Sequence, residues 1–81
     1  MKRIIYNVKH RNDEWHVVKK TFSAAEGHPA TEGRFKSKPD AVDLARFLAM
    51  REEVGELRIL SVDGSIQSEF LFGKDPYQIE G

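Results

Sequence analysis

The chain has 81 residues and a formal net charge of zero, which predicts one small domain without room for a large enclosed active site. It contains no cysteine, so disulfides and thiolate metal sites are excluded. No run approaches the ~20 apolar residues of a membrane span, and residues 1–10 lack the pattern of a signal peptide, so we expect a cytoplasmic protein.

The charges cancel overall but are unevenly spread. Residues 1–38 contain nine Lys and Arg and four Asp and Glu, whereas residues 39–81 contain four and nine. The first half is therefore basic and the second acidic. This asymmetry indicates either a basic surface for an acidic partner or two halves that attract each other, and we favour the second interpretation.

Residues 3–21 have the alternation of a β-hairpin with a polar turn around residues 11–14. The register that pairs His10 with Trp15, Val8 with Val17 and Tyr6 with Lys19 places most of the larger apolar side chains on one face. The opposite face then carries a basic strip. Its members are Arg3, Lys9, Arg11, His16 and Lys20.

Residues 23–34 contain two glycines, a proline and several small residues, which predicts a flexible loop. A helix follows, with Ser37 as N-cap, Asp40 as the acid of a capping box and an end near Glu53, where Gly55 would supply a left-handed C-cap. Its apolar stripe would cover one face of the sheet. This stripe comprises Ala41, Leu44, Ala45 and Leu48.

Residues 57–72 form two alternating runs around Asp63-Gly64, which predicts a second hairpin. A two-residue type I′ turn at Asp63-Gly64 would pair Ser61 with Ile66, Ile59 with Ser68 and Leu57 with Phe70. The core face would then comprise Leu57, Ile59, Ile66 and Phe70. Residues 73–81 lack periodicity and are predicted to be an irregular tail.

The predicted element order is β-β-α-β-β within a single domain that spans residues 1–81. An antiparallel sheet of two hairpins, covered on one face by one helix, is a two-layer α+β sandwich. A small domain with two sheet edges also has a physical reason to pair an edge with a second copy.

Three sequence landmarks occur together. They are Glu14-Trp15-His16-Val17, Ser37-Lys38-Pro39-Asp40-Ala41, and Asp63-Gly64-Ser65-Ile66-Gln67 followed by Phe72-Gly73-Lys74-Asp75-Pro76. This combination resembles a family of small bacterial proteins classed only as a domain of unknown function, with a W-x-V strand, an Ala-rich helix and a D-G-x-I-Q ending followed by Gly and Asp-Pro. The resemblance implies a compact bacterial domain and transfers no catalytic residues.

The residues themselves show no catalytic constellation. In the predicted register His10 and His16 project to opposite faces, and His28 lies in the loop, so no metal-ligand set is expected. The serines near the second hairpin lack the glycine-flanked context of a nucleophile. We therefore expect a protein that is not an enzyme and needs no cofactor.

Two functions follow from the outer face of the predicted sheet. The first is a protein-interaction or self-associating module, such as a homodimer, that uses this face or a strand edge. Its candidate partner surface comprises Ile5, Val18, Leu60, Val62 and Leu71. The alternative is a nucleic-acid-binding accessory or regulatory protein that uses the basic strip, although Tyr6 and Trp15 fall on the core side and provide no stacking platform there.

Overall fold

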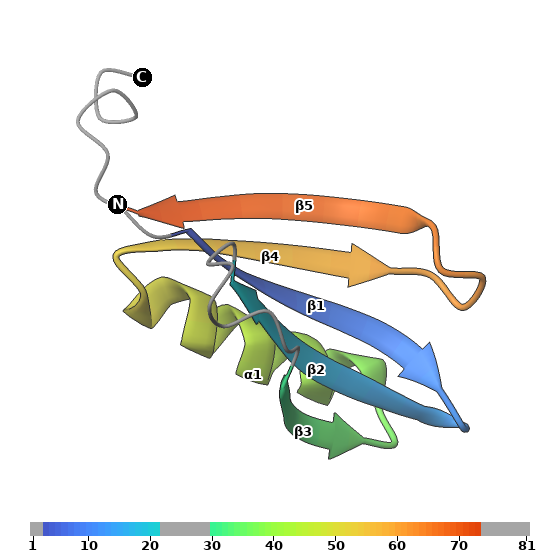
Figure 1. The fold of residues 1–81 in the computed structure, drawn as a ribbon. Coiled ribbons are helices and arrows are strands. Elements are labelled where there is room, and N and C mark those ends of the chain that lie inside the picture. Colours follow the sequence, from blue (N-terminus) through green and yellow to red (C-terminus); the bar gives the residue numbers. More distant parts are fainter. Residues whose placement is uncertain (1–2, 22–29, 74–81) are drawn as a thin grey trace.

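Five strands and one helix form two layers in the computed structural model, which describes residues 3–21 and 30–73 (Figure 1). The elements are β1 (Ile4–Arg11), β2 (Glu14–Thr21), β3 (Ala30–Phe35), α1 (Lys38–Arg51), β4 (Val54–Leu60) and β5 (Ile66–Gly73). The strand order across the sheet is β3-β2-β1-β4-β5. The prediction of an α+β fold with one helix on one face of a sheet is confirmed.

The sheet is mixed, so the prediction of a purely antiparallel sheet in the order β-β-α-β-β was wrong. The two predicted hairpins are present, but they join through a parallel contact between β1 and β4. The cause is β3, which pairs with β2, so the prediction of a loop over residues 23–34 was wrong for residues 30–34. Because this additional strand reverses the chain direction once more before the helix, β4 runs parallel to β1. Residues 23–29 of the predicted loop and 74–81 of the predicted tail lie outside the described residues, whereas Gly73, the first residue of that tail, belongs to β5.

The first hairpin has the predicted register, with Val8 opposite Val17 and His10 opposite Trp15. Its turn residues, Asn12 and Asp13, have φ angles of 52° and 62°. Two successive positive φ angles are the requirement of a two-residue type I′ turn, which asparagine and aspartate tolerate better than other non-glycine residues. The type I′ turn of this protein therefore lies in the first hairpin.

The second hairpin has a three-residue loop, so the predicted type I′ turn at Asp63-Gly64 was wrong. Gly64 has a φ of 92°, whereas Asp63 does not have a positive φ. The Gly64 N–H donates to Ser61 O over 2.9 Å, and the Ser61 N–H donates to Ser65 O over 2.9 Å. This is the geometry of a turn followed by a left-handed glycine. Hydrogen bonds from Ser61 and Ser65 to the Asp63 carboxylate lower its pKa to about 2.

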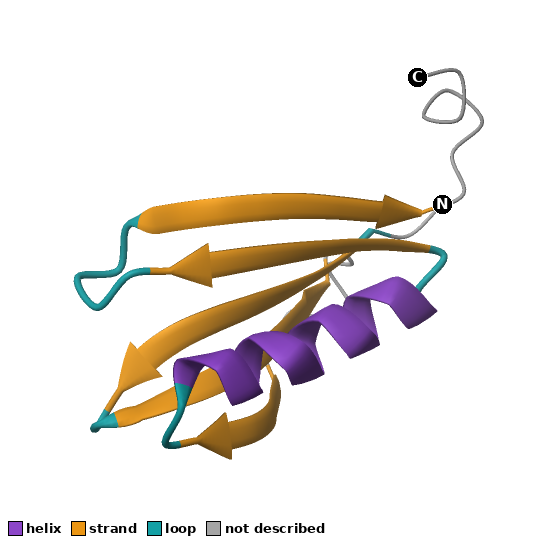
Figure 2. Ribbon diagram, turned by 180° about the vertical axis from the view of Figure 1, so that it is seen from behind, coloured by secondary structure: helices purple, strands orange, loops and turns teal. Residues whose placement is uncertain are grey.

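The loop type changes the register near the turn. Leu57 pairs with Phe70 and Ile59 with Ser68 as predicted, but an irregularity then pairs Leu60, not Ser61, with Ile66. Ile66 therefore shares the outer face with Leu60, and its predicted place in the core was wrong. Leu57 is fully buried, whereas Phe70 remains 45% exposed on the helix side because α1 lies mainly over the other strands (Figure 2).

The core lies where α1 packs on the centre of the sheet. Three fully buried alanines four residues apart face the strands, and their small side chains allow the helix to approach closely. The strand side chains that they meet are also buried. These core residues are Ile4, Tyr6, Val8, Val17, Leu57, Ala41, Ala45 and Ala49.

The helix ends differ from their predicted caps. Ser37 is the N-cap residue, but its side chain makes no capping hydrogen bond. The C-cap is Glu52 in an extended conformation, and its N–H donates to Ala49 O. Gly55, the predicted left-handed cap, is instead buried in β4, where an added Cβ would lie 2.1 Å from Ala49 O. Glycine is needed there for close approach of two backbones.

Replacing Gly55 by alanine should therefore lower the free energy of unfolding by about 3 kcal/mol or more, because the new methyl group meets backbone that cannot move aside. Urea denaturation followed by circular dichroism measures the loss. Gly33→Ala is the matched control, since its added Cβ would first meet the flexible tip of the Leu44 side chain at 2.8 Å. Equal losses in the two variants would contradict this account of Gly55.

Candidate functional site

The sheet face opposite α1 is not covered by another element among the described residues (Figures 1 and 2). Because directly paired residues share a face, the registers order this outer face into rows that cross the strands. The first row is Lys20, Ile5, Glu56 and Leu71, the second is Thr31, Val18, Asn7, Arg58 and Glu69, and the third is Arg34, His16 and Lys9.

The predicted partner surface does not form one continuous patch. Ile5 is only 3% exposed, although it lies on the outer face between Lys20 and Glu56. Val18 and Leu60 are half-buried, and Leu60 pairs with Ile66. Val62 is exposed in the hairpin loop, and Leu71 is exposed on the edge strand β5. Polar members of the rows separate these five side chains.

An ion-pair cluster occupies the β1–β4–β5 side of the outer face. The Glu56 side chain is buried, and Arg58 Nε lies 2.5 Å from its Oε2. Arg3 Nε lies 3.5 Å from Glu56 Oε1, and Arg58 also contacts Glu69 Oε2 at 3.1 Å. Buried charge is tolerated when it is paired in this way. The cluster uses Arg3 as a structural partner of Glu56.

The predicted basic strip is thereby divided. Arg3 joins the ion-pair cluster, and Lys20 lies opposite Ile5, four residues along β2 from His16. Lys9 and His16 remain directly opposite each other, and β3 adds Arg34 opposite His16. Arg34 was not selected from the sequence, because its segment was assigned to a loop. The sequence signal that could have identified it is the alternation of the charged Arg34 with Gly33 and Phe35, which is compatible with a strand.

The two edges of the sheet differ in character. β3 is six residues long, contains a register irregularity opposite Val17 and Val18, and includes Glu32 and Arg34. β5 also contains a register irregularity, next to Ile66, and one charged residue, Glu69, but it is eight residues long and exposes Ile66, Phe70 and Leu71. Short, irregular or charged edges resist strand pairing, whereas long apolar edges favour it. Among the described residues no strand pairs with the outer edge of β5.

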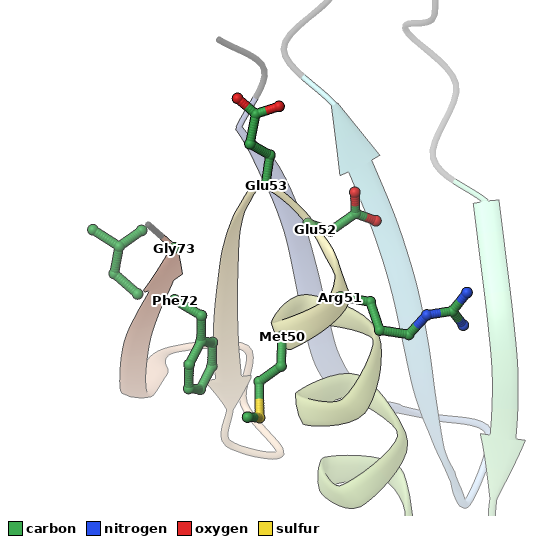
Figure 3. A pocket seen from close by; sticks show the side chains of 7 residues that line it. Met50, Arg51, Glu52, Glu53, Phe72 and Gly73 are labelled. Carbon is green, nitrogen blue, oxygen red and sulfur yellow. The ribbon is translucent and has the colours of Figure 1, made fainter. Parts of the chain in front are cut away.

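A depression of about 680 Å³ lies between the end of α1 and the end of β5. Figure 3 shows Met50 and Phe72 beside this space, whereas the Glu53 carboxylate points away from it. Met50 is exposed, and Phe72 packs partly against the core. The depression is thus lined by both apolar and charged residues, since Arg51 and Glu52 also border it.

A polar cluster links β1 to the end of the helix on the other flank of α1. The Tyr6 hydroxyl donates to Glu52 Oε2 over 2.5 Å, although the Tyr6 side chain is almost fully buried. Burial raises the pKa of Tyr6, and the hydrogen bond and negative charge of Glu52 raise it further. The adjoining depression has a volume of about 290 Å³. It is lined by Tyr6, Lys19, Glu32, Leu48, Arg51 and Glu52.

The histidines lie apart from one another. The His10 and Trp15 rings meet edge to face with centroids 4.9 Å apart, and Lys38 Nζ lies 5.0 Å from the Trp15 ring centroid. His16 Nε2 lies 3.2 Å from Arg11 O on the other face. His28 lies outside the described residues. Across residues 3–21 and 30–73, no group of three potential ligand side chains is placed to hold a metal ion.

The fold and its surfaces define a small single-helix α+β domain with an open outer sheet face and an apolar edge strand. The chain belongs to the family described as "Uncharacterized protein conserved in bacteria (DUF2188)", whose model matches residues 5–71. The predicted resemblance to a bacterial domain of unknown function is confirmed. No curated protein and no solved structure matches the chain significantly. Within the described part of the chain, no helix is long and apolar enough to span a membrane.

Replacing Tyr6 by phenylalanine should lower the free energy of unfolding by about 1–2 kcal/mol, because the change removes a buried hydrogen bond to a carboxylate. Urea denaturation of Tyr6→Phe, Glu52→Ala and the double variant measures the effect. A coupling energy of about 1 kcal/mol is expected between residues that share one bond. Additive losses would show that the two side chains act independently.

The same bond has a pH dependence. The pKa of Tyr6 is higher in the folded chain than the ~10 of an unfolded tyrosine. The contribution of the Tyr6 hydrogen bond to the stability of the folded state is therefore complete below about pH 10. It is lost as the pH rises toward the folded-state pKa. Above pH 10 the stability of the wild type should therefore fall more steeply than that of Tyr6→Phe. Parallel curves for the two proteins would contradict this assignment.

Proposed function

We propose that this chain is a non-catalytic protein-interaction module that self-associates by pairing β5 with β5 of a second copy. The observation that supports it most strongly is the asymmetry of the two sheet edges, one short with two charges and the other longer with three exposed apolar side chains. Strand addition at an edge uses backbone hydrogen bonds for affinity and alternate side chains for specificity. The absence of cysteine fits the proposed cytoplasmic location.

The strand pairing has a preferred register. Two β5 strands related by a two-fold axis through the sheet run antiparallel, and their paired residues share a face. Phe70 and Ser68 lie on the helix side, as Leu57 and Ile59 do, whereas Glu69 lies with Arg58 on the outer side. A two-fold axis at Glu69 would place two carboxylates opposite each other. An axis at Phe70 instead pairs two aromatic side chains, worth about 0.5–1.5 kcal/mol beyond their burial.

This arrangement makes one continuous ten-stranded sheet with the two helices on the same side. Phe70, which is 45% exposed in one copy, would be enclosed at the junction. Nucleic-acid binding, the alternative expected from the sequence, would use the opposite end of the sheet around β1, β2 and β3. The two functions therefore do not compete for the same residues.

Light scattering after size-exclusion chromatography tests the proposal. The wild type should have twice the 9.3 kDa mass of one chain. Phe70→Lys should be monomeric, because two lysines would face each other at the axis. Phe47→Lys is the matched control, since Phe47 is 58% exposed on the helix and should leave the dimer intact. A monomeric wild type at about 100 µM, or a dimeric Phe70→Lys, would overturn the proposal.

Complementary charges test the register. Phe70→Glu should also be monomeric alone, but an equimolar mixture of Phe70→Glu and Phe70→Lys should form a heterodimer. Only a register that places position 70 opposite itself predicts this rescue. A mixture that stays monomeric would contradict the proposed position of the two-fold axis at Phe70.

A further inference from the structure

A cationic row crosses the outer face at the end of the sheet that is distant from β5. Lys9 of β1 lies opposite His16 of β2, and His16 lies opposite Arg34 of β3. Neighbouring strands are about 4.8 Å apart, so the three side chains are anchored over about 10 Å. Arg11 extends the row along β1 and is exposed, as is Arg34.

The irregularity in β3 increases the positive charge of this row. Gly33 pairs with Val17 and Thr31 pairs with Val18, so Glu32 is the additional residue between them. In a regular strand Glu32 would share the outer face with Arg34, because side chains alternate. Instead Thr31 takes the outer position opposite Val18. The negative charge of Glu32 raises the pKa of Tyr6, which lies on the helix side.

Two other acidic residues of the outer face, Glu56 and Glu69, form ion pairs with arginines. Glu56 and Glu69 contact Arg58, and Glu56 also contacts Arg3. Glu14 lies opposite Arg11. Among the described residues Lys9 and Arg34 form no ion pair, so their charges remain available, whereas Arg11 faces Glu14. The chain as a whole is neutral, and the positive potential is therefore local.

A shallow depression of about 610 Å³ adjoins the row. Its lining adds Asn12, Thr31 and the acidic residue Glu32 to the two arginines and the histidine. The full lining is Arg11, Asn12, His16, Thr31, Glu32, Gly33 and Arg34. Arginine, asparagine and threonine side chains are common donors to phosphate oxygens.

We propose that this cationic row binds the phosphate backbone of a nucleic-acid duplex without sequence specificity. A duplex is favoured over a single strand because single-strand sites stack bases on aromatic side chains. In the described residues every aromatic ring other than histidine lies on the helix side of the sheet or on the helix itself. These rings belong to Tyr6, Trp15, Phe35, Phe47, Phe70 and Phe72. Backbone contacts need only cations and polar donors.

Fluorescence anisotropy with a labelled mixed-sequence 30-base-pair DNA duplex tests the proposal. Binding should be detectable at about 20 mM NaCl and fall with a log–log slope near −3, since each neutralised phosphate contributes about −0.9. Arg34→Glu should weaken binding about tenfold at 20 mM NaCl, and Arg34→Gln should reduce the magnitude of the slope by about 1. A second duplex of unrelated sequence should bind equally well.

Arg46→Glu is the matched control, because it makes the same charge change at an exposed arginine on α1, on the other side of the sheet. Its affinity should remain within about twofold of the wild type, as expected when no phosphate contact is lost. Circular dichroism melting of all variants separates loss of binding from loss of fold. No binding at 20 mM NaCl, equal weakening by Arg34→Glu and Arg46→Glu, or tighter binding to the single strand than to the duplex would each overturn the proposal.

Discussion

The width of α1 limits how much of the sheet the helix can cover. An α-helix with its side chains is about 10 Å across, whereas five strands spaced by about 4.8 Å span nearly 20 Å. The buried alanines of α1 centre the helix on the middle of the sheet, above Tyr6, Val8 and Leu57. β5 consequently keeps Phe70 exposed, and no described element covers the outer face. Both proposed surfaces follow from this limit.

The local sequence pattern was sufficient to predict much of the secondary structure, but it was not sufficient to predict the sheet topology. The register of the first hairpin and the existence of the helix follow from alternation and spacing, and both were predicted. β3 was missed because Ala30–Phe35 contains one bulky apolar side chain, a glycine and two charges, which is weak evidence for a strand. That single omission also reversed the predicted direction of β4, since each element turns the chain around.

The candidate surfaces were predicted only in part, for two physical reasons. An Asp-Gly pair fits a type I′ turn and also a three-residue loop that ends in a left-handed glycine, and the choice decides whether Ile66 faces the core. Pairing between strands that are distant in sequence then decides which charged side chains lie next to each other. Glu56 engages Arg3 and Arg58, and β3 adds Arg34 to Lys9 and His16. In each of these two groups, at least one residue is distant in sequence from the others.

The parallel contact between β1 and β4 has a consequence for how the chain folds. Its first pair joins Ile4 to Gly55, so the centre of the sheet is also its most non-local part. The two antiparallel hairpins, by contrast, close over short loops and can form early. We therefore expect the pairing of β1 with β4, which has the larger loop-closure entropy, to limit the folding rate.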